Sequence, residues 1–370
     1  VIGGSFAKDT HLKGDHDVDV FVKFSLRYKS KDISEMLADA FKTLKMERVH
    51  GSRDYFQLKK GTLLYEIVPV LDISQNKQAQ NTTDFSPWHV DWVERNGKNL
   101  KGDIRLAKKF CKAAKVYGAE SFIRGFSGHV IDILVIHYGG FIPFLEAALT
   151  WKPKVIIDFA DHYQGQVLRM MDKSKTEGPL IVVDPVQHRR NASSSLGKEK
   201  FFAFKRAAQN FLAAPSLDDF EERPLDVKRV RMKKGTVIIL EIDSKKARRD
   251  VAGSKLLQLF DYVGRHIEEF DLKEKGWEWT EGQVATMWWS CQKKQLPLMT
   301  IKEGPPENAL HHKDAFLDKY PKAFVKNHRF YARIRRDWTL PREILDILKK
   351  DEYVKERCDK FTVKLVRTNE

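Results

Sequence analysis

The sequence has 370 residues, of which 42% are hydrophobic and 11% aromatic, and its 66 Lys and Arg against 51 Asp and Glu give a formal charge of +15. A chain of this length outgrows a single hydrophobic core, so we expect about two to four domains, and its ordinary composition excludes a disordered or fibrous protein. The positive charge favours a polyanionic partner such as nucleic acid over a small acidic protein.

The cysteines and the apolar segments exclude further classes of protein. Cys111, Cys291 and Cys358 are far apart and lack a CxxC spacing, so neither a disulfide framework nor a zinc site is predicted. No apolar run approaches the roughly 18 residues that span a bilayer, and no leader pattern opens the chain. We therefore expect a soluble cytoplasmic protein without a membrane partner. Because Val1 opens the chain in a pattern typical of a buried strand, we also expect residues upstream of it.

The first elements predict an α+β domain over residues 1–95. Alternating apolar residues at 17–24 indicate a half-buried strand, and apolar residues at helical spacing indicate an amphipathic helix over 32–47. Two β-rich runs at 55–59 and 62–70 are separated by Lys-Gly, which is a hairpin signal. The helix is expected to cover the sheet that these strands form.

From residue 102 onward, the spacing of the apolar residues becomes that of helices. Apolar stripes at 102–149 and again at 197–212 predict a helical middle domain over residues 96–214, and Pro215 marks its end.

The C-terminal part, 215–370, reads as an α+β body and tail. A β-branched run at 236–242 predicts a strand, 251–270 predicts an amphipathic helix, and Pro305-Pro306 predicts a loop.

The sharpest local motif is a Gly3-Gly4-Ser5 turn followed by an acidic strand. Such a turn lets backbone N–H groups and a hydroxyl approach a phosphate without a side-chain clash, and Lys8 adds positive charge nearby. Asp17 and Asp19 are one residue apart on the predicted strand, so they share a face on which they can bind a hard divalent cation.

Glu66 is the candidate for a third carboxylate. It lies on the second strand of the predicted hairpin among apolar residues, where an acidic side chain needs a partner. Three carboxylates are able to hold two metal ions for an in-line displacement. The alternative is that Asp17 and Asp19 are solvated charges that protect a sheet edge, but that reading does not explain the preceding Gly-Gly-Ser turn.

The turn and the two aspartates together resemble the signature of the polymerase β-like nucleotidyltransferase superfamily. Five further motifs, in the same order, resemble the archaeal (class I) CCA-adding tRNA nucleotidyltransferases. They are Ser86-Pro87-Trp88-His89, Arg105-Leu106-Ala107-Lys108, Tyr117-Gly118-Ala119-Glu120, Arg124-Gly125-Phe126-Ser127-Gly128, and Asp184-Pro185 through Arg190-Asn191. The resemblance covers Val1 to about Leu212 and continues more diffusely beyond it.

The resemblance implies a fold, a reaction and a set of roles. It implies a polymerase β-like head in which Asp17, Asp19 and Glu66 bind two Mg²⁺ ions. The residues implied to hold the triphosphate are Ser5, Lys8, Lys108 and Tyr117. Those implied to surround the base of CTP or ATP are Ser86, His89 and Arg190.

Two departures from the family pattern affect these roles. The family usually carries Asp at the position of Glu66 and Thr at that of Ser86, so both functional groups are kept. Glu is one methylene longer, and Mg²⁺ prefers strict octahedral geometry, so we expect the strand or the metal to adjust. Taken singly, His89, Lys108 and Tyr117 also suit a packing histidine, a surface lysine and a half-buried core tyrosine.

A basic and aromatic stretch near the C-terminus is expected to contact tRNA. Its cations are Lys322, Lys326, Arg329, Arg333, Arg335 and Arg336, and they alternate with Phe324, Phe330, Tyr331 and Trp338. Such a surface suits the phosphates of a tRNA acceptor arm whose 3′ end enters the active site. The alternative is a solvated helix face over an aromatic core.

We therefore expect template-independent addition of CMP, CMP and AMP from CTP and ATP to the 3′ end of tRNA, with release of pyrophosphate. A poly(A) polymerase or an oligoadenylate synthetase is the alternative within the same chemistry, and an RNA-binding protein without activity is the alternative outside it. A homodimer is compatible with the resemblance.

Overall fold

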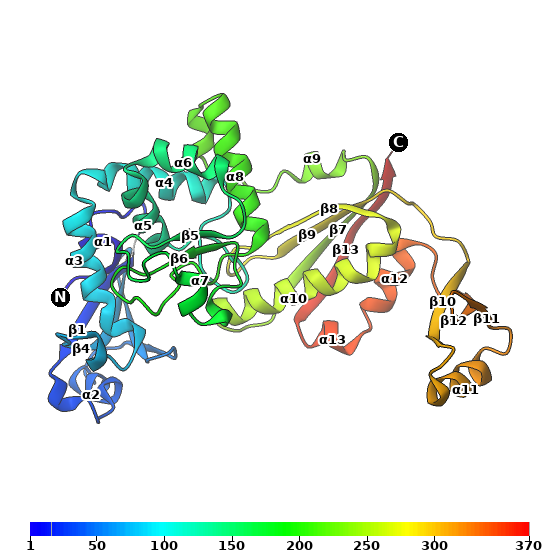
Figure 1. Cartoon of the computed structure of the whole chain (residues 1–370), viewed down its shortest axis with the longest axis horizontal. Coiled ribbons are helices and arrows are strands. Elements are labelled where there is room, and N and C mark those ends of the chain that lie inside the picture. The colour runs from blue at the N-terminus through cyan, green and yellow to red at the C-terminus, as the bar shows by residue number, and fades with distance from the viewer. Residues whose placement is uncertain (16, 370) are drawn as a thin grey trace. The chain divides into compact units, whose positions relative to one another are not determined.

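The computed structural model describes residues 1–15 and 17–369, so His16 of the acidic motif lies outside the described residues. The chain divides into two compact units, Val1–Glu222 and Arg223–Glu370 (Figure 1). Both units combine sheets with helices, which confirms the predicted α+β fold class. The domain boundaries predicted at 95 and 214 stay predictions.

The first unit begins with a four-stranded mixed sheet in the order β1-β4-β3-β2. Strand β1 (Asp17–Phe24) pairs in parallel with β4 (Leu63–Leu71), whereas β3 (Tyr55–Lys60) pairs antiparallel with β4 and with β2 (Glu47–Val49). The predicted strand and hairpin are thereby confirmed. The parallel pairing of β1 with β4 matters most for the site, because it places Asp19 beside Glu66.

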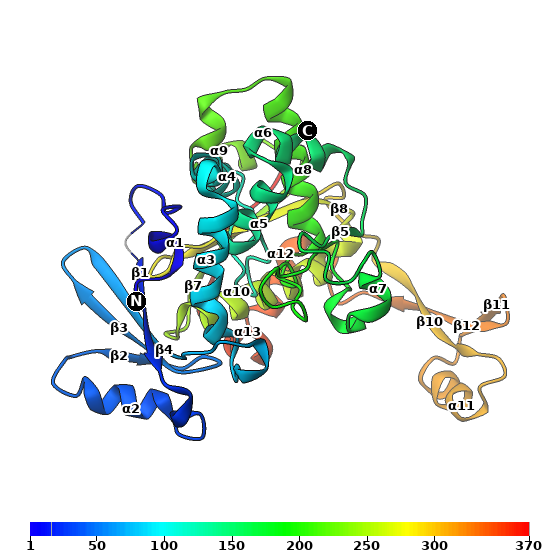
Figure 2. The same cartoon turned by 60° about the vertical axis from the view of Figure 1, so that its left-hand side comes forward.

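The helix predicted over 32–47 is shorter in the structure. Helix α2 (Ile33–Ala40) begins at Asp32, whose carboxylate accepts two backbone N–H groups, and it lies beside the sheet with Leu37 buried (Figure 2). A turn then leads into β2, whose backbone pairs with β3 instead of continuing the helix. The helix is therefore shorter than its apolar pattern predicted, because the end of the predicted segment leads into a strand that pairs with the edge of the sheet.

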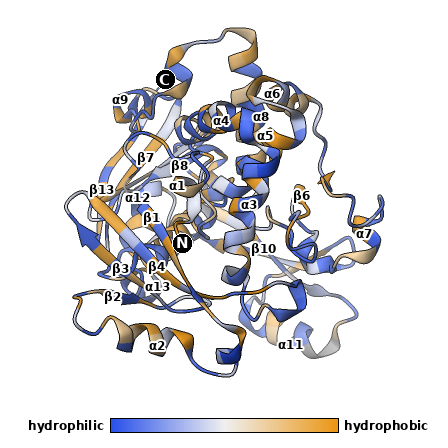
Figure 3. Ribbon diagram, turned by 90° about the vertical axis from the view of Figure 1, so that its left-hand side faces the viewer, coloured by the Kyte–Doolittle hydropathy of each residue, from blue (hydrophilic) through white to orange (hydrophobic). Residues whose placement is uncertain are grey.

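The helical prediction for the middle of the chain is confirmed, and Figure 3 shows apolar residues along these helices. The long helices of this part are α3 (Ser86–Asn96), α4 (Lys101–Ala113), α5 (Gly128–Tyr138), α6 (Phe141–Thr150) and α8 (Lys198–Ala213). Their shared core is rich in packed aromatic rings, with Phe110, Phe144 and Phe204 all fully buried.

The structure adds short elements that the helical pattern did not predict. Strands β5 (Val155–Ile157) and β6 (Leu180–Val182) form a two-stranded parallel sheet, with helix α7 (Val167–Met170) between them. Short 3-10 turns join other elements: η1 Leu26–Tyr28, η2 Asn76–Gln78, η3 Thr82–Phe85, η4 Lys98–Leu100, η5 Lys173–Lys175, η6 Leu217–Phe220 and η7 Glu268–Phe270.

The second unit is built on an antiparallel sheet in the order β13-β7-β9-β8. Its strands are β7 (Gly235–Ser244), β8 (Leu272–Glu278), β9 (Ala285–Cys291) and β13 (Cys358–Asn369). The helices of this unit's body are α9 (Val227–Arg231), α10 (Arg249–Ile267), α12 (Pro341–Leu348) and α13 (Glu352–Lys355). The strand predicted at 236–242 and the helix predicted from 251 are confirmed, and Trp289 is buried in the core of this unit.

A second, three-stranded sheet in this unit corrects one expectation. Strand β10 (Met299–Pro306) contains Pro305-Pro306, which we predicted as a loop. β10 is an edge strand in the order β10-β12-β11, and an edge tolerates proline because its outer N–H groups need no partner. The other strands are β11 (Phe324–Lys326) and β12 (Arg329–Arg335), and helix α11 (Leu310–Lys319) precedes them.

No single helix within the described residues is both long and apolar enough to cross a membrane. Helices α5 and α6 reach that length and composition only together, and the chain bends by 91° between them. The three cysteines are buried and free.

Candidate functional site

The three predicted metal-binding carboxylates come from two neighbouring strands. In the parallel ladder of β1 and β4, Asp19 is the direct partner of Glu66, and Asp17 lies one alternation earlier on the same face of β1. Asp17 is exposed and Asp19 is half-buried. The pairing of two distant strands thus forms one acidic face.

Without a bound cation, the negative charges of the carboxylates on this face repel one another. Burial raises the pKa of Asp19, and the charge of Asp17 raises it further. Burial also raises the pKa of Glu66, and Asp19 and Asp17 add to the rise although the Gln57 side chain donates to Glu66 Oε1 at 2.7 Å. Anionic oxygens that disfavour one another at close range are the donor set that a hard divalent cation prefers.

The glycine turn brings the backbone directly against this face. Short helix α1 (Gly4–Ala7) begins next to β1, and the Gly3 N–H donates to the Asp19 carbonyl at 2.8 Å. Gly4 has a φ of +59°, and a Cβ atom there would lie 1.6 Å from Asp19 Oδ2. Only glycine therefore lets the Asp19 carboxylate occupy this place. Ser5 follows in α1 and is half-buried.

Lys8 and Lys108 meet at a carboxylate that the sequence reading did not single out. Asp132 of α5 is buried and pairs through one oxygen with Lys8 Nζ and through the other with Lys108 Nζ, both at 2.9 Å. Lys108 also donates to Thr10 Oγ1 at 2.8 Å. Its pKa is lowered by burial, although Asp132 opposes the shift. Two ammonium groups on one carboxylate leave a net positive charge, which suits a polyphosphate.

Tyr117 lies beside this cationic group. A Cβ atom added to Gly128 would lie 3.0 Å from the Tyr117 hydroxyl and 3.6 Å from Lys108 Cε, so the tyrosine and the lysine both reach the first turn of α5. Burial raises the pKa of the Tyr117 hydroxyl, which therefore stays protonated and able to donate. The structure thus brings together Lys8, Lys108 and Tyr117, the three predicted triphosphate contacts that follow Ser5.

His89 and Arg190 converge on a second buried carboxylate, Asp184. His89 Nε2 lies 3.0 Å from Asp184 Oδ2, and Arg190 Nη1 lies 3.3 Å from the same oxygen. His129 Nε2 approaches this oxygen to 3.4 Å. Burial alone would raise the pKa of Asp184, but hydrogen bonds from His129 and His89 hold it well below its usual range. Sequence reasoning named His89 and Arg190, gave Asp184 only as the start of a motif without a role, and missed His129.

The Asp184 cluster has the spacing of a metal site, whereas the predicted acidic face does not. The potential ligand atoms of His89, His129 and Asp184 all lie within 4.8 Å of one another. Among residues 1–15 and 17–369, this is the one group of three His, Cys, Asp or Glu side chains with that spacing. His89, Arg190 and two backbone N–H groups already hydrogen-bond to Asp184, so the oxygens of this carboxylate are occupied.

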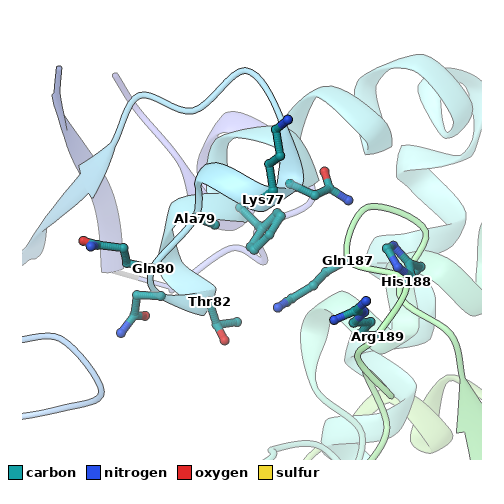
Figure 4. Close-up of a pocket in the computed structure, with 10 residues that line it drawn as sticks. Lys77, Ala79, Gln80, Thr82, Gln187, His188 and Arg189 are labelled. Carbon is teal, nitrogen blue, oxygen red and sulfur yellow. The ribbon is translucent and has the colours of Figure 1, made fainter. Parts of the chain in front are cut away.

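Ser86 begins α3 directly after η3 and is half-buried. A cavity of about 480 Å³ lies next to it, between the segment 76–85 and the loop that carries residues 187–189 (Figure 4). Ser86 and Arg190 each stand one residue beyond the ends of these lining segments.

Four basic residues of the C-terminal stretch lie on strands and not on a helix face: Lys326 on β11, and Arg329, Arg333 and Arg335 on β12; Arg336 directly follows β12. Lys326, Arg333 and Arg335 are exposed, with the two arginines alternating outward on β12. Arg329 pairs with Glu303 at 2.5 Å, and Arg336 pairs with Glu269 at 2.6 Å. Lys326, Arg333 and Arg335 are therefore available to a ligand, while Arg329 and Arg336 are held within the unit.

Comparison with known proteins gives matches along most of the chain. Residues 102–221 match the family model described as tRNA nucleotidyltransferase, second domain, and residues 235–356 match CCA-adding enzyme, C-terminal domain. The CCA-adding enzyme of Nanoarchaeum equitans is 32% identical over 92% of this chain and 84% of its own length. That of Thermococcus kodakarensis is 30% identical over 98% of this chain and 82% of its own length. That of Methanoregula boonei is 28% identical over 92% of this chain and 76% of its own length.

Proposed function

This chain belongs to the family of the archaeal CCA-adding enzymes, and from that premise we propose that it adds CMP, CMP and AMP to the 3′ end of tRNA without a template. The observation that best supports this reaction is the position of the acidic face of Asp17, Asp19 and Glu66 on β1 and β4, directly against the Gly4 turn. The 3′ hydroxyl attacks the α-phosphate of CTP or ATP, the bond to the β-phosphate breaks, and pyrophosphate leaves.

The family depends on divalent metal ions, and we propose that the acidic face holds two Mg²⁺ ions. The donor set fits by its chemistry and not by its spacing in this structure, because the charges of Asp17 and Asp19 raise the pKa of neighbouring carboxylates, which therefore gain from a cation between them. When bound, the ions supply positive charge to the phosphate oxygens as the new bond forms. The residues themselves must be ionised to bind, so addition should weaken in acid.

Lys8, Lys108 and Tyr117 bind the triphosphate in this proposal, together with the Ser5 hydroxyl. The net positive charge around Asp132 is buried, where its interaction with phosphate is stronger than in water. Asp132 keeps both ammonium groups in place before the nucleotide arrives, so little reorganisation is required. These groups stabilise the leaving pyrophosphate.

Base selection falls to Ser86, His89 and Arg190. Asp184 fixes the rotamer of His89 and the direction of the Arg190 guanidinium, so Arg190 presents its remaining donors, and His89 its other ring nitrogen, in a set orientation. A fixed donor pattern distinguishes the amino and carbonyl groups on the edges of C and A from those of U and G. Side chains held in fixed positions thereby select CTP and ATP without a nucleic-acid template.

The tRNA binds through phosphates, and exposed Lys326, Arg333 and Arg335 are the contacts we assign, with Arg329 and Arg336 shaping the same sheet. We place the reaction in the cytoplasm, where tRNA and nucleotides meet. Sedimentation distinguishes a monomer from the homodimer that the resemblance allows.

The test is incubation with Mg²⁺ and a tRNA that lacks its 3′ CCA, supplied with CTP and ATP singly and together, followed by sequencing of the 3′ ends. We expect C and C from CTP alone and the complete C, C and A from both. Long A tails would instead indicate a poly(A) polymerase, and tRNA binding without addition would indicate an inactive RNA-binding protein.

A further inference from the structure

Gln57 lies beside the third carboxylate of the acidic face, and no role above uses it. In the antiparallel ladder of β3 and β4, Gln57 is the direct partner of Glu66, and Glu66 is in turn the partner of Asp19 on β1. Residues paired in this way point to the same face of a sheet. Gln57 therefore stands on the acidic face, on the side of Glu66 opposite to Asp19.

One hydrogen bond joins the two side chains. Gln57 Nε2 donates to Glu66 Oε1 at 2.7 Å, and both residues are half-buried, so water competes less for this bond than at an exposed site. Because an ionised carboxylate only accepts, the amide has to turn its N–H group toward it. Within residues 1–15 and 17–369, this is the one hydrogen bond of the Glu66 carboxylate.

The hydrogen-bond partner of Glu66 is neutral, whereas two other buried carboxylates of this unit are paired with cations. Asp84 pairs with Arg53, and Asp132 pairs with two lysines. A cation beside Glu66 would neutralise it, but an amide fixes the carboxylate and leaves its negative charge on the face. That arrangement suits a carboxylate whose counter-charge is a bound metal ion.

The same bond decides which oxygen of Glu66 is available. Oε1 already accepts from Gln57, so Oε2 is the oxygen that can face a cation while the hydrogen bond is kept. Mg²⁺ demands near-ideal octahedral geometry, which a carboxylate bound through both oxygens distorts because these oxygens lie too close together. Ca²⁺ is more flexible and accepts carboxylates through one oxygen or both. Holding Glu66 to one oxygen therefore favours Mg²⁺.

We propose that Gln57 is a positioning residue that acts through Glu66: it restricts this carboxylate to one metal-binding oxygen and so gives the acidic face its preference for Mg²⁺ over Ca²⁺. The inference rests on the proposed function, which places divalent ions on this face. Removing a side chain that holds a metal ligand typically weakens metal binding by about 10- to 100-fold. Without Gln57, Glu66 rotates freely and can bind through both oxygens, which disfavours Mg²⁺ more than Ca²⁺.

The experiment measures metal binding without turnover, in the absence of nucleotide and RNA. Mn²⁺ binding is followed by electron paramagnetic resonance, and Mg²⁺ and Ca²⁺ are then titrated as competitors. The variants are Gln57→Leu, which keeps the side-chain size, and Gln57→Thr, which suits a strand but is too short to reach Glu66. Gln258→Leu is the matched control, because Gln258 is an exposed glutamine of the second unit that also forms one side-chain hydrogen bond, to Arg357.

Binding at the acidic face is the part of Mn²⁺ binding that Asp19→Asn removes. Both Gln57 variants should raise the Kd for Mg²⁺ at this face by about tenfold or more and change the Kd for Ca²⁺ by less than about twofold. Glu66→Asp withdraws the carboxylate from Gln57 by one methylene. In that background, Gln57→Leu should change either Kd by less than about twofold, because the two side chains no longer interact.

Equal weakening of both ions, an unchanged Kd for Mg²⁺, or the same loss in the Glu66→Asp background would overturn the proposal, since each would leave Gln57 a purely structural residue. If Asp19→Asn removed no Mn²⁺ binding, the acidic face would not be the metal site and the proposal would fail with it. Absence of CCA addition by a wild-type protein that shows this metal preference would count against the proposed function alone, because the readout needs no turnover.

Discussion

At the scale of single residues, the site is organised around two buried carboxylates that each collect several cationic or donating groups. Asp132 holds Lys8 and Lys108, and Asp184 holds His89 and Arg190. A buried charge is tolerated only when it is paired, so each aspartate fixes its partners as firmly as they fix it. Removing one aspartate should disturb the nucleotide site without touching the nucleotide.

Asp184→Asn should therefore raise the KM for CTP and ATP by roughly 10- to 100-fold, the range expected for loss of one charge-assisted hydrogen bond. The effect on kcat should be smaller, because the acidic face is unchanged. Steady-state kinetics with each nucleotide measures both constants.

Asp158→Asn is the matched control for that variant, since Asp158 also accepts two backbone N–H groups, those of His162 and Tyr163. It should destabilise its loop and leave both KM values near the wild-type level. If the KM values of Asp184→Asn equalled those of Asp158→Asn, the role assigned to Asp184 in orienting His89 and Arg190 would be wrong.

His129 should make the protein less stable in acid. Burial lowers its pKa to about 4, whereas an unfolded histidine titrates near its ordinary pKa of about 6.5. Between these values the unfolded chain binds the proton first, so stability is complete above about pH 6.5 and is lost as the pH falls toward 4. The loss should amount to about 3 kcal/mol at most.

Chemical unfolding of the wild-type protein and His129→Phe across this pH window measures the effect. The variant should show a flatter dependence on pH, while His328→Gln, a change at an exposed histidine, should follow the wild-type slope. Parallel curves for wild type and His129→Phe would show that another group carries the acid sensitivity.

At the scale of elements, the pairing of β1 with β4 and the Gly4 turn decide where the chemistry takes place. Both features were predictable: the alternation at 17–24, the hairpin signal and the Gly-Gly-Ser motif all correspond to observed elements. Their patterns are local, or repeat with the period of the element, and so they are visible in the sequence.

Gly4→Ala should abolish most activity while leaving the fold intact. The new methyl group would collide with Asp19 Oδ2 and displace a carboxylate of the acidic face, and a displacement of about 1 Å can cost about 100-fold in rate. Gly61→Ala is the matched control, because Gly61 has a similar φ of +62° but open space around it. Both variants should lose similar stability in thermal unfolding, and only the first should lose CCA addition; equal activity would contradict this reading.

Other elements were not predictable, for reasons that concern distant parts of the chain. The short strand β2 has a helical pattern before it and forms only because β3 offers an edge. The three-residue strands β5 and β6 are too short to show a period, and each needs the other. Asp132 and the role of Asp184 were not predicted because Lys8, Lys108 and His89, which contact them, are distant in sequence, although an aspartate inside the apolar run of α5 is a signal that a partner exists.

At the scale of the whole molecule, the basic residues behind the formal charge of +15 differ in whether they are available to bind RNA. Part of it is consumed by internal pairs, such as Arg329 with Glu303 and Arg336 with Glu269, and part is exposed on β12. Only exposed cations release counterions when RNA binds, so only they should govern the dependence of affinity on salt.

Arg333→Ala/Arg335→Ala should weaken tRNA binding and lower the slope of log K against log salt concentration by about 2, one unit for each lost phosphate contact. Titrations at several salt concentrations measure the slope. Lys349→Ala/Lys350→Ala removes two exposed cations elsewhere in the same unit and should leave the slope unchanged. The same slope for both double variants would indicate nonspecific attraction by total charge.

The central claim is that the acidic face of Asp17, Asp19 and Glu66 carries out the transfer. The most direct test is single-turnover addition of CMP to a tRNA lacking CCA by Asp17→Asn and Asp19→Asn, with tRNA affinity measured in parallel. We predict that addition by either variant falls by about 1,000-fold or more while the Kd for tRNA stays within about twofold of wild type. Addition at the wild-type rate by either variant would contradict the assignment of this face as the catalytic centre.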